Sequence, residues 1–339
     1  MDRDREMGME AIPESPELDG QTRLVGVIGW PVAHSLSPVM HNAALRRMGL
    51  NWHYVPLPVH PRGVGDAIHG AAALGFRGVN VTVPHKQAVM ALMDRVAPEA
   101  SAVGAVNTVV MTRDAGGGVI LEGHNTDVDG FLGSLRAGGF EPSGGGKGVV
   151  IGAGGAARAV AYGLLTAGMV EIVVLNRTVS RAQALVADLQ RAGAGRRGVG
   201  RPSRVRAGAL TPEGLQAETQ GATLLVNATT VGMWPKGNGS VWPDELPMPV
   251  HLTVYDLVYN PLETRLLCQA RDSGSRVIDG LGMLARQGAL ALALWLDTSV
   301  DVEAITVEMR RACLTALELR QQLPRQQSPR QLPADEMVE

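Results

Sequence analysis

Lys86 is the first residue of this chain whose type and position suggest proton chemistry. The chain has 31 lysines and arginines, of which three are lysines and 28 arginines, and Lys86 closely follows the apolar stretch at residues 78–83. Arginine does not release its proton at workable pH, whereas burial and neighbouring charges can tune a lysine to exchange one. Lys86 is therefore a candidate for proton transfer. The alternative at this stage is an ordinary surface lysine after a strand.

A second chemical pattern is a glycine-rich loop after the apolar stretch 149–151. Residues 152–157 read Gly-Ala-Gly-Gly-Ala-Ala, which has the form G-x-G-x-x-A, and an alanine-rich stretch follows up to Gly168. In such loops the first glycine permits a tight turn, the second lets the backbone approach a pyrophosphate, and a small residue at the end allows close helix packing. The loop predicts dinucleotide binding at a helix N-terminus. A purely structural turn is the alternative.

The residues after the next apolar stretch indicate which dinucleotide is bound. The stretch 171–175 is followed by Asn176-Arg177-Thr178, with Arg181 one helical turn later. NAD enzymes usually place a carboxylate here to hold the ribose 2′-hydroxyl. Guanidinium groups and a hydroxyl instead suit a 2′-phosphate, because they bind it through charge-assisted hydrogen bonds. The sequence therefore favours NADP(H), with helix capping by these arginines as the alternative.

Small polar side chains gather near the ends of apolar stretches in the N-terminal part of the chain. If residues 78–83 form a strand, Asn80 and Thr82 point to one face and the valines between them to the other. Each polar residue alone is compatible with an ordinary turn or cap. Together they would line a pocket suited to a small polyhydroxylated acid. The residues concerned are Ser35, Ser37, Asn80, Thr82, Asn107, Asn125, Thr126 and Asp127.

The elements that must position these residues alternate between strand and helix. We expect strands at 24–29, 54–58, 78–83, 149–151, 171–175, 224–228 and 252–257. We expect helices at 37–49, 64–74, 87–96, 131–139, from the glycine loop to 168, at 281–296 and at 302–319. This alternation predicts an α/β fold with mostly parallel sheets. A length of 339 residues favours two domains, because single cores rarely grow that large.

Composition excludes several classes of protein. The formal net charge of −2 lacks the excess of positive charge expected of a protein that binds nucleic acid or anionic membrane surfaces. No apolar run is long enough to span a bilayer, and the acidic residues 1–22 do not resemble a signal peptide. The two cysteines lack metal-ligand spacing, so we expect no metal site and a reducing compartment. The expectation is a soluble cytoplasmic protein, with disordered ends at 1–22 and 320–339 and a solvated arginine-rich loop at 191–206.

These motifs give the chain a family resemblance. It resembles the shikimate dehydrogenases from about residue 24 to residue 319. The resemblance implies a Rossmann-like NADP-binding domain at 127–279, beside an α/β substrate-binding domain formed by 23–126 and 280–319, with the active site in the cleft between them. The matching segments are 28–32, 34–38, 80–86, 104–108, 125–127, 152–156, 176–178, 227–229, 256–259 and 280–287.

The resemblance also implies an activity and a role for individual residues. The implied reaction is the reversible NADP-dependent reduction of 3-dehydroshikimate to shikimate in aromatic amino acid biosynthesis. Lys86 and Asp127 match the catalytic pair. The positions that match substrate contacts are Ser35, Ser37, Asn80, Thr82, Asn107, Tyr259 and Gln287. The positions that match cofactor contacts are Gly152, Ala153, Gly154, Gly155, Ala156, Asn176, Arg177, Thr178, Arg181, Leu257, Gly280 and Met283.

Some questions stay open at the level of sequence. The family often has a glycine after Asn-Thr-Asp, whereas here Val128-Asp129-Gly130 brings a second carboxylate close to Asp127, and loop 191–206 looks longer than usual. A quinate dehydrogenase and a non-catalytic NADP-binding regulator are the alternative functions. A Schiff-base lysine enzyme would not need the dinucleotide loop. The sequence also leaves open whether Lys86 acts as a general acid, as an electrostatic stabiliser or as both. It does not decide between a monomer and a homodimer.

Overall fold

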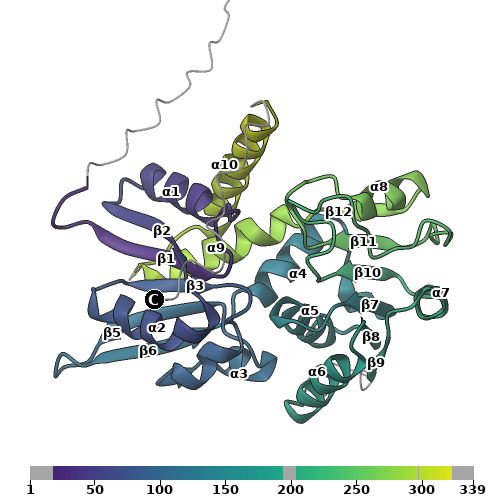
Figure 1. Cartoon of the computed structure of the whole chain (residues 1–339), viewed down its shortest axis with the longest axis horizontal. Helices are drawn as coiled ribbons and strands as arrows, with labels where there is room; N and C mark the ends of the chain where they lie inside the picture. Colours follow the sequence, from purple (N-terminus) through teal and green to yellow (C-terminus); the bar gives the residue numbers. More distant parts are fainter. Residues whose placement is uncertain (1–17, 194–203, 297, 323–339) are drawn as a thin grey trace, which may run out of the picture.

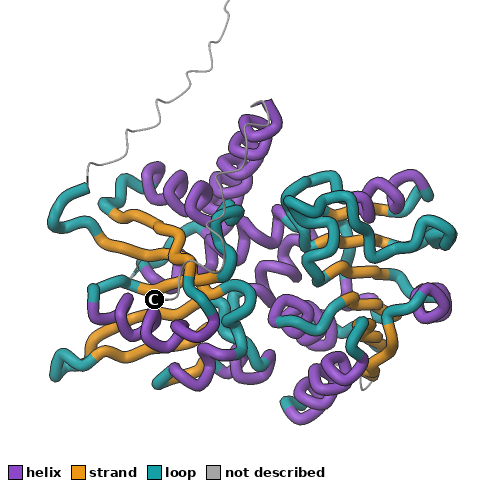
Figure 2. The backbone as a smooth tube through the Cα atoms, viewed as in Figure 1, coloured by secondary structure: helices purple, strands orange, loops and turns teal. Residues whose placement is uncertain are grey.

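The computed structural model describes residues 18–193, 204–296 and 298–322, which form two lobes. Each lobe is built on a six-stranded sheet with helices packed around it (Figure 1). The tube view shows the same division, with strands grouped into two separate sheets (Figure 2). Within the described residues no helix is long and apolar enough to cross a membrane.

The first lobe contains a mixed sheet with the strand order β2-β1-β3-β5-β6-β4. Strands β1 (Arg23–Gly29), β2 (Trp52–Pro58) and β3 (Gly78–Val81) pair in parallel, as do β4 (Arg95–Val96) and β6 (Val119–His124). Strand β5 (Thr108–Arg113) runs antiparallel to both β3 and β6. The hairpin between β5 and β6 closes on Asp114, whose carboxylate accepts hydrogen bonds from the backbone N–H groups of Gly116 and Gly118.

The helices of the first lobe come from both ends of the chain. They are α1 (Ser37–Arg47), α2 (Val64–Ala73), α3 (Pro98–Val103), α9 (Leu281–Trp295) and α10 (Val302–Gln322), with short 3-10 turns η1 (Pro61–Gly63) and η2 (Ala88–Leu92). Helices α9 and α10 return to the first sheet and share an apolar core with β1 and α1. The indole of Trp295 donates to the backbone oxygen of Val109, in a space that only a glycine at position 78 leaves free.

The second lobe contains a wholly parallel sheet with the strand order β12-β11-β10-β7-β8-β9. This is the doubly wound order: strands are added outward from β7 to β9 on one side, and from β10 to β12 on the other, so the strand order switches between β7 and β10. Its strands are β7 (Lys147–Ile151), β8 (Glu171–Asn176), β9 (Arg204–Ala209), β10 (Leu224–Asn227), β11 (Thr253–Asp256) and β12 (Arg276–Ile278). Its helices are α4 (Asp127–Ala137), α5 (Gly155–Thr166), α6 (Val179–Arg191), α7 (Pro212–Thr219) and α8 (Arg265–Asp272), with the turn η3 (Pro142–Gly144). The predicted α/β class with mostly parallel sheets is confirmed.

One predicted element is wrong, and several boundaries differ. The helix expected at 87–96 is the short turn η2 followed by strand β4. The backbone N–H of Asp94 donates to the backbone oxygen of Leu121, and the carboxylate of Asp94 accepts from the N–H of Leu121. These bonds tie the segment to β6, so it forms a strand and does not continue as a helix. The β5–β6 hairpin was not expected. Strand β3 ends two residues early, and helix α4 begins at Asp127 rather than at 131.

The ends of the described chain also differ from expectation. Helix α10 continues to Gln322, past the predicted tail boundary at 320. Asp19 and Thr22, in the predicted arm, form side-chain hydrogen bonds with Asn51. The rest of the arm, the rest of the tail and residues 194–203 of the arginine-rich loop lie outside the described residues. The flanks of that loop belong to regular elements, because Arg191 ends α6 and Arg204 begins β9.

Candidate active site

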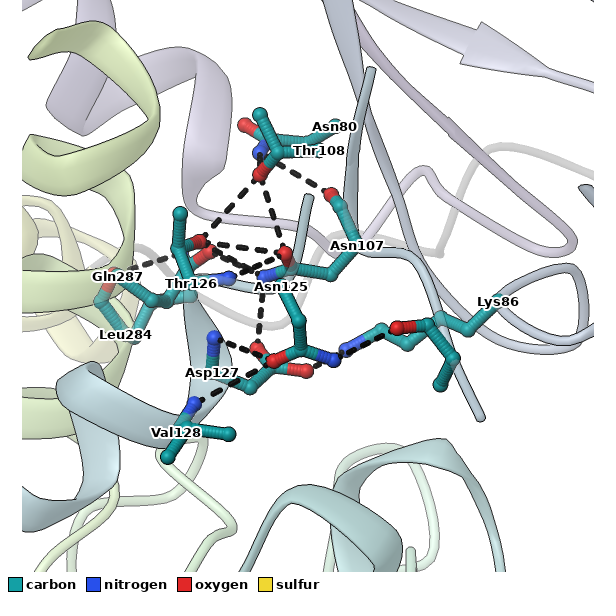
Figure 3. Close-up of polar contacts among 11 residues, drawn as sticks. Asn80, Lys86, Asn107, Thr108, Asn125, Thr126, Asp127, Val128, Leu284 and Gln287 are labelled. Atoms are coloured by element: carbon teal, nitrogen blue, oxygen red, sulfur yellow. Dashed lines mark hydrogen bonds and ion pairs between the residues drawn. The ribbon is translucent and has the colours of Figure 1, made fainter. Parts of the chain in front are cut away.

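Lys86 lies at the end of the turn after β3 and points toward the start of α4 (Figure 3). Its backbone oxygen accepts a hydrogen bond from the N–H of Val106, which fixes the main chain at this point. Its Nζ donates to Oδ2 of Asp127 over 2.6 Å. The two side chains are only 14% and 5% exposed, so the ion pair is largely shielded from water. The two residues of the predicted catalytic pair are therefore in direct contact.

Asp127 is the first residue of α4, a position that suits a negative charge. The partial positive charge of a helix N-terminus stabilises a carboxylate there. The preceding segment is held by Asn125, whose side-chain oxygen accepts from the backbone N–H of Asp127 over 3.1 Å. The second carboxylate oxygen, Oδ1, accepts from Nδ2 of Asn107 over 2.9 Å. Both oxygens of this buried carboxylate therefore have donors.

Asn107 is held in one orientation by its neighbours (Figure 3). Its Oδ1 accepts from the backbone N–H of Thr126 over 2.8 Å, which leaves its amide nitrogen facing Asp127. The same nitrogen also lies 2.9 Å from Oγ1 of Thr126 and 3.4 Å from Oε1 of Gln287 on α9. Gln287 is thereby brought to the same site, although it lies 180 residues away in the sequence.

Asn80 supports this arrangement from β3. Its Oδ1 accepts from the hydroxyl of Tyr54 over 2.8 Å, and its Nδ2 donates to Oγ1 of Thr108 and to the backbone oxygen of Asn107. These protein groups use both of its donors and one lone pair of its oxygen, so Asn80 supports Asn107, and its predicted contact with substrate stays a prediction. Tyr54 and Thr108 are site residues that sequence reasoning missed. The signal available was that Tyr54 begins the predicted strand 54–58, because aromatic side chains in strands often pack on the half-buried face of a sheet.

The predicted residues near the first strand form a second polar group. The hydroxyl oxygen of Ser35 accepts from the backbone N–H of Ser37 over 3.1 Å. Burial raises the pKa of Tyr259 to about 12, and a hydrogen bond with Ser35 opposes this shift. Burial likewise raises the pKa of Tyr54, opposed by a hydrogen bond with Ser37. Thr82 packs with its methyl group against Gly29 at the end of β1, where a side chain on residue 29 would clash with it.

The glycine loop connects β7 to α5 as predicted. Gly152 has φ +114°, and a Cβ there would lie 3.0 Å from the backbone oxygen of Ala228, so both conformation and space require glycine. Gly154 has nothing within 4 Å of its Cβ position and leaves one side of the loop open. Ala157 is fully buried in the core beneath the loop. Ala153 and Ala156 lie in the same turn, between β7 and the first residues of α5.

The predicted 2′-phosphate residues follow β8, the strand next to β7. The side-chain amide of Asn176 donates to the backbone oxygen of Thr178 over 2.9 Å and tightens the turn into α6. Arg177 and Arg181 are exposed, and neither forms an ion pair with a residue that the structure describes. Two guanidinium groups at the carboxyl end of β8 suit a phosphate on the cofactor ribose.

The remaining predicted cofactor residues lie where β11 and β12 lead into α9. A Cβ on Gly280 would lie 2.2 Å from the backbone oxygen of Leu257, so these two segments meet backbone to backbone. Met283 is buried in the core of the second lobe. Asp256, which sequence reasoning did not single out as a site residue, organises this turn. It accepts hydrogen bonds from Asn227, Thr264 and Val258, and burial raises its pKa to about 6.

Asp129 acts outside this constellation. The pKa of Glu99 on α3 is raised to about 7, mainly by burial and in smaller part by the negative charge of Asp129. Glu99 lines a cavity of about 890 Å³ among α3, α5 and α6, together with Tyr162 and Asp188. None of the predicted catalytic, substrate or cofactor residues lines that cavity.

A doubly wound sheet with a phosphate-binding loop, and a Lys–Asp pair beside that loop, define a pyridine-nucleotide-dependent oxidoreductase. Two family models match the chain: the shikimate dehydrogenase substrate binding domain over residues 27–109, and shikimate / quinate 5-dehydrogenase over residues 139–195. A shikimate dehydrogenase (NADP(+)) of Methanopyrus kandleri is 44% identical over 304 residues, covering 89% of this chain and 99% of the relative. The chain belongs to the shikimate dehydrogenase family.

Solved structures agree with this assignment. A crystal structure of shikimate dehydrogenase in complex with NADP+ is similar with a TM-score of 0.75 and 34% identity, over 90% of this chain and 99% of that one. The shikimate 5-dehydrogenase of Thermus thermophilus, in complex with NADP(H) and shikimate, is similar with a TM-score of 0.70 and 41% identity, over 86% and 99% of the two chains. The two-lobed fold is therefore the fold of the family.

Proposed function

We propose that this chain is an NADP-dependent shikimate dehydrogenase, which reversibly reduces 3-dehydroshikimate to shikimate in aromatic amino acid biosynthesis. The observation that carries this proposal is the 2.6 Å contact between Lys86 and Asp127, beside the dinucleotide loop of a doubly wound sheet. The open side of Gly154 fits the pyrophosphate of NADP. The exposed Arg177 and Arg181, which follow the neighbouring strand β8, fit its 2′-phosphate.

In the proposed mechanism the proton comes from the protein. When bound, NADPH supplies the hydride that reduces the C3 ketone. Lys86 gives its proton to the ketone oxygen as that oxygen gains negative charge, and it takes the proton back in the oxidative direction. Asp127 holds the ammonium through Oδ2, and Asn107 holds Asp127 through Oδ1. Positioning of this kind lowers the barrier because the groups need not reorganise during the reaction.

The polar groups around the pair would bind the substrate. We assign the carboxylate end to Ser35, Ser37 and Tyr259, and the ring hydroxyls to Thr82, Asn107 and Gln287. Their hydroxyl and amide groups suit a small polyhydroxylated acid. For the domains we propose substrate binding by 23–126 with 280–319 and NADP binding by 127–279, in a cytoplasmic enzyme. A homodimer stays a prediction, which light scattering on the 35.7 kDa chain would distinguish from a monomer.

The proposal is tested by a spectrophotometric assay that offers shikimate and quinate with NADP and NAD in all four combinations. We expect the highest kcat/KM for shikimate with NADP. A preference for quinate would move the chain to the quinate branch of the family, and no activity in any combination would favour a regulator. Lys86→Ala should lower kcat by about a hundredfold to ten-thousandfold, the usual contribution of general acid–base catalysis. Lys86→Arg should be nearly as impaired, because it keeps the charge without a readily exchanged proton.

A further inference from the structure

The side chain of Lys86 lies against Gly155 of the dinucleotide loop. A Cβ built on Gly155 would lie 3.1 Å from both Cβ and Cδ of Lys86 and 3.6 Å from its Cγ. Carbon atoms in ordinary contact are about 3.5–4.0 Å apart, so a methyl group would fit here only if Lys86 moved away by a few tenths of an ångström. The lysine belongs to the first lobe and the glycine to the second, so the contact joins the two lobes at the site.

The backbone does not explain the glycine at position 155. Gly155 is the first residue of α5 and is not among the described glycines with positive φ, whereas Gly152 in the same loop has φ +114°. A residue in helical conformation accepts alanine readily, and alanine is the strongest helix former. The neighbouring Gly154 has nothing within 4 Å of its Cβ position. The contact with Lys86 is thus the reason the structure offers for a glycine at 155.

Lys86 has little freedom to give way at this contact. Its main chain is held by the hydrogen bond from Val106, and its Nζ is held 2.6 Å from Asp127. The aliphatic stem of Lys86, which is its chain of methylene groups between these two fixed points, passes over Gly155. A methyl group there would push the stem by a few tenths of an ångström and so disturb the ammonium, and small misplacements of catalytic groups can cost large factors in rate.

We propose that Gly155 is a positioning residue, which seats the stem of Lys86 on the dinucleotide loop so that its ammonium is aimed at the reacting oxygen. This inference rests on the proposed role of Lys86 in proton transfer. Each glycine of the loop then has a separate role. Gly152 forms the turn, Gly154 leaves the open side for the phosphates, and Gly155 leaves room for the proton donor.

The test compares Gly155→Ala with Gly154→Ala. For Gly155→Ala we expect kcat at saturating substrates to fall at least tenfold and its pH profile to shift. The Kd for NADPH, measured by fluorescence, should stay within about threefold, and the melting temperature should be unchanged or higher. For Gly154→Ala we expect weaker NADPH binding, because a methyl group there would occupy the open side of the loop.

Several outcomes would overturn the inference. One is a Gly155→Ala enzyme with normal kcat and pH profile, while Lys86→Ala is inactive; the proposed function would then stand and only the positioning role would fail. Another is a Gly155→Ala enzyme whose only defect is weak NADPH binding, since the glycine would then serve the phosphates. An active Lys86→Ala enzyme would instead remove the proposed role of Lys86 in proton transfer, on which this inference rests, and the dehydrogenase activity would stand.

A double variant covers the case in which Gly155→Ala does not fold. Combining it with Lys86→Gly removes both Cβ and Cδ, the two closest atoms. If the clash with Lys86 is the cause, the double variant should fold and bind NADPH like Lys86→Gly alone. Failure of the double variant to fold would place the conflict elsewhere and refute the inference.

Discussion

Asn107 donates from Nδ2 to Oδ1 of Asp127 over 2.9 Å, while Lys86 binds the other carboxylate oxygen over 2.6 Å. The buried carboxylate is thus clamped between an amide and an ammonium, and the amide is itself oriented by the backbone N–H of Thr126. The Lys–Asp pair and the polar residues around it therefore work as one unit, which suggests how each part should respond to substitution.

Asn107→Asp tests the clamp with almost no change in volume. It would replace the donor to Asp127 by a second carboxylate, and two carboxylates at this distance repel each other strongly. We expect kcat/KM at neutral pH to fall by about a hundredfold or more, measured by steady-state kinetics. A variant with unimpaired kinetics would contradict the arrangement of Asn107 and Asp127 described above. Thermal melts on the same samples separate this effect from loss of fold.

Tyr54→Phe tests the support beneath Asn107. The variant keeps the ring but removes the hydroxyl that donates to Oδ1 of Asn80 over 2.8 Å, and Asn80 is 6% exposed. A buried acceptor without a donor costs about 1–3 kcal/mol. We therefore expect a loss of stability of that size in urea unfolding, with a higher KM for shikimate. No change in either quantity would mean that this hydrogen bond does not support the site.

Arg177 and Arg181 should set the preference for NADP over NAD. We expect Arg177→Ala and Arg181→Ala each to raise the KM for NADP by about tenfold, the loss of roughly 1.4 kcal/mol expected for one charge-assisted contact. The KM for NAD should change little, because NAD lacks the 2′-phosphate. Arg113→Ala, which removes an exposed charge on the β5–β6 hairpin, serves as the control and should leave both values unchanged. Equal losses with NADP and NAD would show that these arginines do not read the 2′-phosphate.

His41 should make the protein sensitive to acid. Its ring is fully buried, stacks on Tyr54 with centroids 4.1 Å apart, and has no hydrogen-bond partner among the described residues. Burial lowers its pKa from 6.5 to about 3. Between these values the unfolded chain binds a proton that the folded chain does not, so stability is lost as the pH falls below about 6.5, by up to about 1.4 kcal/mol per pH unit.

The variant His41→Phe isolates this effect. It keeps an aromatic ring against Tyr54 but cannot take up a proton. Urea unfolding between pH 4 and pH 7 should show a smaller dependence on pH for the variant than for the wild type. Parallel curves for the two proteins would rule out His41 as a source of acid lability. The comparison is needed because other groups, such as Glu218 with a pKa near 2 beside Arg206, change stability in the same direction.

The second lobe was easier to predict from sequence than the first. Its strands at 149–151 and 171–175 are short apolar runs in regular alternation with helices, and the glycine loop marks where one strand ends. In the first lobe residues 87–96 have apolar spacing compatible with a helix, yet β4 forms there because β6 is available to pair with it. Pairing between distant strands is decided by the tertiary structure and overrides local preference.

Residue types and motif spacing were sufficient to identify the α/β class, the dinucleotide loop, the arginines at 177 and 181, and Lys86 as a candidate, and the family resemblance added Asp127 as its partner. Local chemistry carries that information, because each motif lies within a few residues. The tertiary structure alone decided how these residues meet. Three contacts at the site join residues that are 20 to 69 positions apart in the sequence. They are Asn107 with Asp127, Asn80 with Asn107, and Lys86 with Gly155. Such contacts depend on how the lobes pack, which no local pattern encodes.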